Sequence, residues 1–405
     1  MATLDTTSAA AILKEYYSNQ RVEQLTYQDA PLYAMLKKVK DFEGSSYPLP
    51  MRITDPQGAS SVFSNAQAQK QPSNYKKFSL TRVRGYSLAS IETEAMLASK
   101  SNPGAFLQLA TAEIDGAIHT MKRRMGWSIY GDGSGALGSI ASVSSANPEV
   151  ITLQNVEDIV KFEVGQTLQA RDGATTRVFA TATASAVITK VDRDAGTITL
   201  GAVDNSGNTD TIVAGDTLNV VGDYNAMLSG LAAWIPSTAP SATPFFGVDR
   251  TVDSTRLGGV RVPSSGKPID EALIDAARRL GREGLGKASD VFCGFSKYAA
   301  LEKTLGAKIR YKDTEVAGIS FRAIEVSGPS GTLAVYPDRD CPENKMYMLD
   351  TSSFALYSLG EPVRLLDQDG NKMLRESTAD ALEVRVGGYF QLGNTMPGAN
   401  AVLTF

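Results

Sequence analysis

The sequence predicts an α+β protein in which a very long helix, a small all-β segment and a compact α/β block follow one another. Apolar residues recur at three- and four-residue steps over residues 103–129, as on one face of an amphipathic helix. Short β-branched runs with turn residues fill 148–226, and strand and helix patterns alternate over 227–345. The 405 residues are enough for two or three domains.

The long helix has recognisable signals at both ends. Asn102 is a favourable N-cap, Pro103 suits the first helical position, and Gly131 is typical of a helix end. A helix over 103–129 is roughly 40 Å long at about 1.5 Å per residue. Its apolar stripe consists of Phe106, Leu109, Ala110, Ile114, Ala117, Ile118, Met121 and Met125.

Residues 41–90 predict a long β-hairpin. Two alternating runs, at 47–53 and 78–88, flank a polar segment rich in Gln, Ser and Asn. Such a tip has too few apolar residues to order itself, so we expect it to need a partner. The basic residues of the returning run either keep a solvated edge from aggregating or contact acidic faces of adjacent subunits; they are Lys76, Lys77, Arg82 and Arg84.

Residues 1–40 predict an arm rather than a domain. Their apolar pattern is broken, and aromatic residues such as Tyr16 and Tyr17 stand outside any regular stripe. A segment of this kind is weakly self-sufficient and can lie on a neighbouring molecule. We therefore group Tyr16 and Tyr17 with the four basic hairpin residues as candidate intersubunit contacts.

Residues 148–226 differ in composition from both flanks and predict an inserted β-rich domain. Thr, Val, Ala and Asp dominate, and turns such as 192–196 separate short strands, which is typical of a small barrel or sandwich. The acidic residues suggest either calcium binding or ordinary turns. They lack the ordered ligand spacing of a calcium loop, which favours turns; they are Asp192, Asp194, Asp204 and Asp210.

The rest of the chain predicts further helices and strands. A helix begins near Pro268 in the α/β block, and the tail at 346–405 is rich in strands. Asp369-Gly370 predicts a hairpin turn. The same stretch resembles the start of a calcium loop, but Lys372 replaces the required glycine and Thr378 the required glutamate.

Composition excludes several classes of function. The net charge of −4 gives no global basic field for nucleic-acid binding. A single histidine, His119, excludes a multi-histidine metal site. Two distant cysteines, Cys293 and Cys341, indicate no disulfide framework. We expect no catalytic residues, cofactor or metal, and no signal peptide or membrane span.

The string Gly133 to Gly138 matches the G-x-G-x-x-G pattern of dinucleotide-binding turns. In those turns the glycines follow a strand and open a helix. Here they follow the long helix and lead toward β-branched residues, which is the reverse order. The pattern therefore favours a helix-terminating turn over a nucleotide site.

The order of these elements resembles the major capsid proteins of tailed bacteriophages, the Johnson fold. The local match is Tyr130, Gly131, Asp132 and Gly133, followed by Gly138-Ser139-Ile140, at the end of the long helix. The resemblance implies an N-terminal arm at 1–40, an extension loop at 41–90 and a peripheral domain with its spine helix at 91–147. It also implies an inserted β-rich domain at 148–226, an axial domain at 227–345 and peripheral return strands at 346–405.

The resemblance implies a shell protein that self-assembles into pentamers and hexamers and forms an icosahedral head around double-stranded DNA. Weak non-specific DNA contact and scaffolding, portal and decoration proteins are the implied partners, with synthesis in the host bacterial cytoplasm. The inserted domain and the lack of a long helical pro-segment depart from the minimal pattern, and the latter implies a separate scaffold or a shorter assembly route. The alternatives are an encapsulin-like nanocompartment, a nucleotide-binding enzyme and a tail-tube protein, the last opposed by the long helix.

Overall fold

The chain divides into two compact units, one formed by Gly131–Ser229 and the other by the residues on either side of it. The computed structural model describes residues 30–93, 103–144, 149–179, 184–201, 211–283, 286, 288–316, 319–329, 331–367, 370, 373–376 and 379–405. Within them, no helix is both long and apolar enough to span a membrane. We call Gly131–Ser229 the barrel unit and the remainder the main unit.

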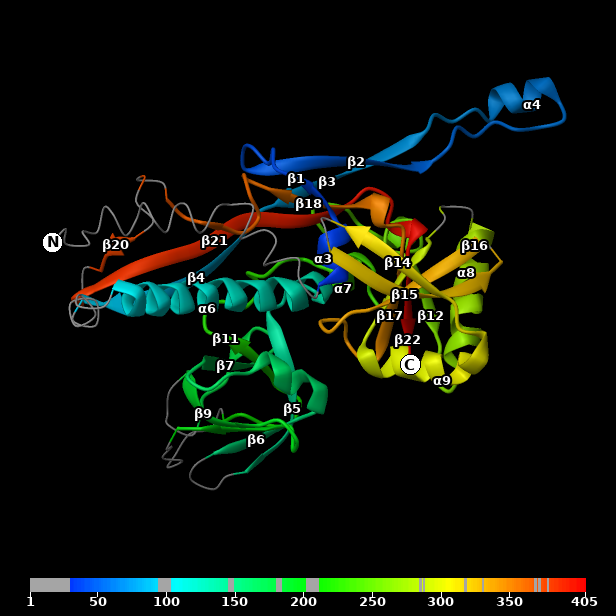
Figure 1. Ribbon diagram of the computed structural model, residues 1–405. Helices are drawn as coiled ribbons and strands as arrows, with labels where there is room; N and C mark the ends of the chain where they lie inside the picture. Colours follow the sequence, from blue (N-terminus) through cyan, green and yellow to red (C-terminus); the bar gives the residue numbers. More distant parts are fainter. Residues whose placement is uncertain are drawn as a thin grey trace. The chain divides into compact units, whose positions relative to one another are not determined.

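The long predicted helix is present in the main unit as α6, Pro103–Tyr130. It packs along two strands, β4 (Val83–Glu92) and β21 (Ala381–Asn394), and Figure 1 shows it lying beside them. Gly85 permits this close approach, because a Cβ there would lie 2.4 Å from the Met121 side chain. The buried face of the described helix is Ile114, Ala117, Ile118, Met121, Met125 and Ile129.

Strand β21 is the hub of a six-stranded sheet in the main unit. It pairs with β4, β18, β19 and β20, and β1 runs parallel to β18. The predicted hairpin around Asp369-Gly370 is not formed by the described strands on either side of it, because both pair with β21 and not with each other; Asp369 itself lies outside the described residues. The bounds are β1 Lys37–Val39, β18 Phe354–Ser358, β19 Arg364–Leu365 and β20 Leu374–Arg375.

The main unit also contains a seven-stranded sheet of order β12-β22-β17-β13-β16-β15-β14. Helices α8 (Ile269–Glu283) and α9 (Phe295–Leu305) pack on it and on each other around a shared apolar core. The sequence predicts a domain boundary between residues 345 and 346. This sheet contains strands from both sides of that boundary, because β17 and β22 pair with strands that precede it. The bounds are β12 Val260–Pro263, β13 Asp290–Cys293, β14 Tyr311–Val316, β15 Ile319–Gly328, β16 Gly331–Pro337, β17 Lys345–Leu349 and β22 Ala401–Thr404.

The barrel unit is a closed β barrel. Its sheet runs β11-β5-β6-β10-β9-β7-β8, and β11 also pairs with β7, so six of the seven strands form a ring. The unit begins at Gly131, upstream of the boundary predicted at 148, because β5 is already part of the ring. The bounds are β5 Ala136–Ser144, β6 Val150–Leu153, β7 Thr167–Asp172, β8 Thr175–Thr176, β9 Ala186–Asp192, β10 Thr197–Leu200, β11 Thr217–Val220 and the 3-10 helix η2 Val156–Lys161.

The points where the chain leaves and rejoins the main unit are adjacent. It leaves after Tyr130 and returns at Gly230, where an added Cβ would lie 2.1 Å from the carbonyl oxygen of Ile129. Gly230 is therefore required for this close approach. The short helices elsewhere in the main unit are α3 Pro31–Met35, α7 Leu231–Trp234, η3 Thr251–Asp253, η4 Gly306–Lys308, η5 Thr351–Ser353 and η6 Pro397–Ala399.

Candidate functional site

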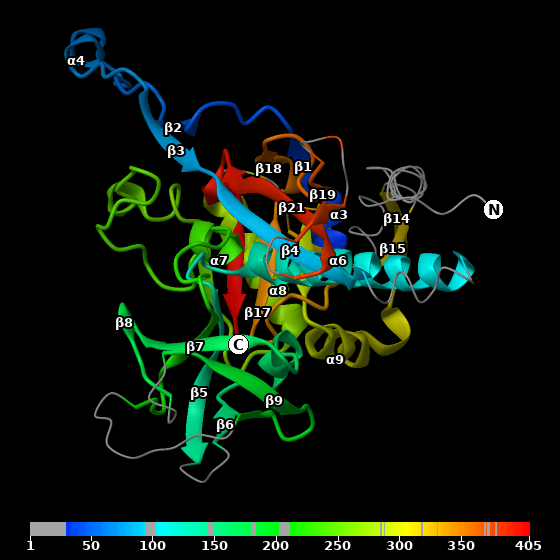
Figure 2. The same ribbon diagram turned by 90° about the vertical axis from the view of Figure 1, so that its left-hand side faces the viewer.

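A two-stranded arm projects from the main unit. Among the described residues, strands β2 (Ser46–Thr54) and β3 (Asn74–Thr81) pair only with each other, and the helix α4 (Phe63–Ala68) lies at the tip. Figures 1 and 2 both show α4 standing clear of the rest of the unit. The returning run at 78–88, predicted as one strand, is divided between β3 and β4 near Arg82. We call residues 46–81 the arm.

The base of the arm is anchored by aromatic packing. Phe78 is fully buried, with its ring centroid 5.1 Å from that of Trp234 and 6.4 Å from that of Phe245. The Ser79 backbone N–H donates to the Phe246 carbonyl at 2.9 Å. These contacts fix the direction in which the arm leaves the main unit.

The tip of the arm is exposed. No residue of α4 is buried, and Phe63 and Val62 are 81% and 50% exposed. Gln57 and Gln71 exchange backbone hydrogen bonds of 3.0 and 2.8 Å below the tip. Large apolar side chains exposed together are typical of a protein contact surface.

The two edges of the arm differ in their hydrogen-bonding capacity. The Ser79 N–H points away from β2, so Ser79 and Pro48 form a non-hydrogen-bonded pair. Because the two pair types alternate along an antiparallel ladder, Lys77 and Pro50, two positions further on, also form a non-hydrogen-bonded pair. Pro48 and Pro50 therefore remove the outward donors from the edge of β2. The edge of β3 at Lys77 keeps both its N–H and its C=O.

The predicted contact residues differ in their surroundings. Lys76 and Lys77 are exposed on β3. Arg82 bonds within the chain, because its guanidinium donates to the carbonyls of Phe42 and Gly44 at 2.8 and 2.7 Å. Tyr16 and Tyr17 lie outside the described residues.

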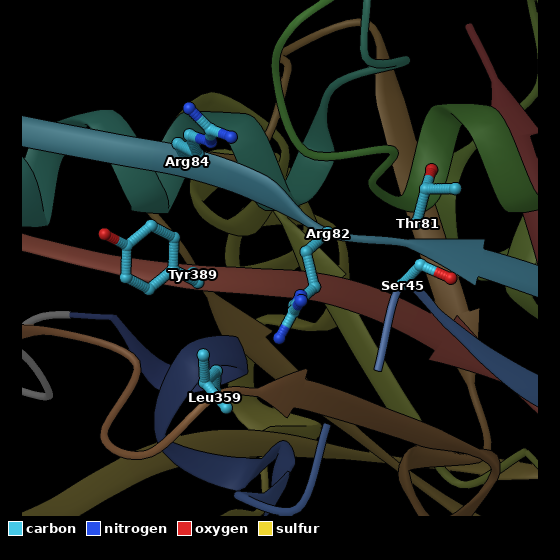
Figure 3. Close-up of a pocket in the computed structure, with 6 residues that line it drawn as sticks. All are labelled: Ser45, Thr81, Arg82, Arg84, Leu359 and Tyr389. Carbon is cyan, nitrogen blue, oxygen red and sulfur yellow. The ribbon is translucent and has the colours of Figure 1, made fainter. Parts of the chain in front are cut away.

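Arg84 lines a cavity of about 320 Å³ where the arm meets the six-stranded sheet. Figure 3 shows the lining side chains around the place where β4 passes β21. Sequence reasoning missed this cavity, because its walls come from segments about 300 residues apart, as the contact of the Tyr86 and Tyr389 hydroxyls at 3.3 Å illustrates. The lining residues are Ser45, Thr81, Arg82, Arg84, Leu359 and Tyr389.

The outward face of β4 continues from this cavity. Tyr86 and Leu88 are 43% and 56% exposed and alternate with residues buried toward α6. Leu359, which is 37% exposed, lines the cavity together with Arg84 and Tyr389. We call Arg84, Tyr86, Leu88, Leu359 and Tyr389 the β4 face.

A buried carboxyl joins three segments at the end of α6. Asp338 Oδ2 accepts from the Tyr130 hydroxyl at 2.8 Å and from the Leu32 N–H at 3.5 Å. Its Oδ1 accepts from the Asp340 N–H at 3.0 Å. Burial, with a smaller contribution from Asp340, raises the pKa of Asp338 to about 6. Nothing in the local sequence at 338 predicts this junction, because Tyr130 lies 208 positions away.

The glycine-rich string forms a tight turn without a phosphate cradle. Asp132 Oδ1 accepts from the Ser134 N–H at 2.9 Å, as in a capped turn. Gly135 has φ +77°, and a Cβ there would lie 2.3 Å from the Asp223 carbonyl oxygen. The space that a pyrophosphate would need is thus filled by the chain itself. In the described part of the chain, no group of three or more His, Cys, Asp or Glu residues could hold a metal ion.

Comparison with known proteins gives one family match. Residues 169–373, which are 205 of the 405, match the family described as SU10 major capsid protein. A chain of the cyanophage A-1(L) capsid asymmetric unit has TM-score 0.53 and 12% identity over 93% of this chain and 92% of that one, which shows the fold.

Two further solved structures cover most of the chain at TM-scores below 0.5. A chain from the capsid of an empty GTA particle has TM-score 0.45 and 10% identity over 93% of this chain and 90% of that one. The holo-SrpI encapsulin from Synechococcus elongatus PCC 7942 has TM-score 0.44 and 12% identity over 100% and 96%. No curated protein sequence matches the chain.

Proposed function

Because the chain belongs to the SU10 major capsid protein family, and is thus a capsid shell protein, we propose that its arm clamps each copy to a neighbour in the shell. Family membership favours a phage capsid over the nanocompartment alternative.

The exposed tip of the arm carries this proposal. The Phe63 side chain is mostly exposed and that of Val62 is half exposed. Both lie on a segment whose base is held by the packing of Phe78 against Trp234. Fully burying a Phe or Val side chain is worth about 1.5–3 kcal/mol. In an isolated copy these side chains stay in water, and a neighbour that covers the tip would bury them and gain this free energy.

The β4 face is the surface on a neighbouring copy that we infer receives the tip. It offers the exposed apolar side chains of Tyr86, Leu88 and Leu359, next to a cavity wide enough for a side chain. The open edge of β3 at Lys77 adds backbone groups to the same contact. Head-to-tail contacts of this kind form rings when the rotation between successive copies closes.

We propose the same roles for the segments as the resemblance implies. The arm lies within the extension loop, α6 is the spine helix, and the seven-stranded sheet is the core of the axial domain. Copies form pentamers and hexamers of an icosahedral head and touch packaged DNA weakly. Scaffolding, portal and decoration proteins assist, and synthesis takes place in the host bacterial cytoplasm.

The test replaces residues 58–70 with an Asn-Gly turn, which favours a two-residue hairpin. The mutual hydrogen bonds of Gln57 and Gln71 make this the natural place to close the shortened arm. We expect a folded subunit with an unchanged circular dichroism melt that forms no shells in sedimentation or negative-stain microscopy. Normal shells from the shortened protein would refute the clamp, and wild-type shells that hold a cargo enzyme instead of DNA would favour the nanocompartment.

A further inference from the structure

Three arginines of the main unit lie close together and bond to the backbone instead of to carboxylates. They are Arg250, Arg261 on β12 and Arg279 on α8, and we call them the arginine row. Arg279 donates to the Arg261 carbonyl at 2.6 Å. Arg250 donates to the carbonyls of Ala233 at 2.7 Å and Trp234 at 3.5 Å. Arg261 donates to the carbonyls of Ser254 and Gly259 at 3.2 Å each, and to the Ser254 hydroxyl at 3.3 Å.

The charges of the arginine row repel one another. Burial lowers the pKa of Arg250 to about 10, and Arg261 lowers it further as a nearby like charge. Burial and then Arg279 lower the pKa of Arg261 in the same way. Burial and like charge therefore act in the same direction on both pKa values. The Nε of Arg250 is also buried without an acceptor in the described part of the chain.

Several other arginines of the chain have carboxylate partners. Arg278, the residue next to Arg279 on α8, lies 3.3 Å from Asp275. Arg322 lies 3.4 Å from Asp313. Partly buried charge, as at Arg250 and Arg261, is costly unless it is paired with an opposite charge. Arg250 lies over the Phe245 ring, 4.2 Å from its centroid, but in the described part of the chain none of the three arginines bonds to a carboxylate. The row therefore points to a counter-charge from another copy.

We propose that the arginine row is an ionic contact between copies, in which it receives carboxylates of a second copy in the shell. This inference rests on the proposed function. Arginine forks bind carboxylates through two parallel hydrogen bonds. Each copy offers many acids, because residues 131–229 alone contain 12 Asp and Glu against 5 Lys and Arg. The row is held rigidly by its backbone acceptors, which suits a fitted protein contact better than a mobile polyanion.

The test is the double variant Arg261→Gln and Arg279→Gln, compared with wild type by sedimentation velocity over a range of protein and salt concentrations. Loss of a charge-assisted contact should raise the protein concentration needed for shells about tenfold or more. The salt dependence of assembly should also become weaker. The control is Arg278→Gln, which removes a paired arginine from the same helix and should leave assembly within about twofold of wild type.

Arg279, which is exposed, is also changed alone, because Arg261→Gln removes the hydrogen bonds of Arg261 to the Ser254 and Gly259 carbonyls. Arg279→Gln should show the same direction of effect with a native circular dichroism melt. If folded variants assemble like wild type, the inference is wrong. It is equally wrong if shells form normally but release their DNA, since the row would then contact nucleic acid. Either result leaves the clamp intact as long as the 58–70 replacement blocks assembly.

Discussion

The arm and the barrel unit are both built from short antiparallel strands, yet their sheets end in opposite ways. The barrel closes by pairing β11 with both β5 and β7, so its ring has no free edge. The arm has two strands: Pro48 and Pro50 block the edge of β2, whereas the edge of β3 stays open at Lys77. A closed sheet satisfies its own backbone, whereas the arm keeps unsatisfied surface for a neighbour.

The largest expected effect is at the base of the arm. Phe78→Ala removes a fully buried ring that contacts Trp234, and such changes cost about 3–5 kcal/mol. Hydrogen exchange should show faster exchange along β2 and β3 and unchanged protection in the barrel. Equal loss of protection in the arm and in the barrel would show that the two regions do not unfold independently.

In the barrel we expect a loss of stability no larger than that at the base of the arm. Leu218 is fully buried on β11, the strand that closes the ring, and Leu218→Ala should cost about 2–5 kcal/mol. Protection should fall in β5, β7 and β11 and stay unchanged in the main unit. If the arm loses protection instead, the two units are energetically coupled.

A third effect concerns pH and the Asp338 junction in the main unit. The folded-state pKa of about 6 lies above the ordinary 3.8, so the folded state binds this proton more tightly. The associated stability is present below the ordinary pKa and is lost as the pH rises through about 6, by roughly 3 kcal/mol for two pKa units. Denaturant titrations of Asp338→Asn should lack this component between pH 4 and 7, and an identical pH profile would contradict the assignment.

The smallest effect on stability is expected at the tip. Phe63→Ser changes an exposed residue and should alter the free energy of unfolding by less than about 0.5 kcal/mol, yet it should abolish or strongly reduce assembly. Phe295→Ser, which changes another exposed Phe, is the matched control and should assemble normally. Equal behaviour of the two variants in sedimentation would rule out a special role for the tip.

Local signals in the sequence sufficed where one segment sets its own structure. The apolar stripe and Gly131 gave α6 its correct extent, and the turn spacing gave a β-rich insertion. Prediction was wrong where distant partners compete, as at Asp369-Gly370, where both flanking strands pair with β21. The contacts of Arg82 with Phe42 and Gly44, which accompany the break between β3 and β4, likewise depend on residues about 40 positions away.

Gly230 has a consequence for how such a protein changes over time. Because it returns beside Ile129, the two ends of the inserted segment meet at one point of the main unit. A different module with adjacent termini could be joined there without stretching α6 or the strands that contact it. The junction is therefore a site of domain insertion, at which a whole domain can be gained, lost or exchanged while the rest of the main unit keeps its structure.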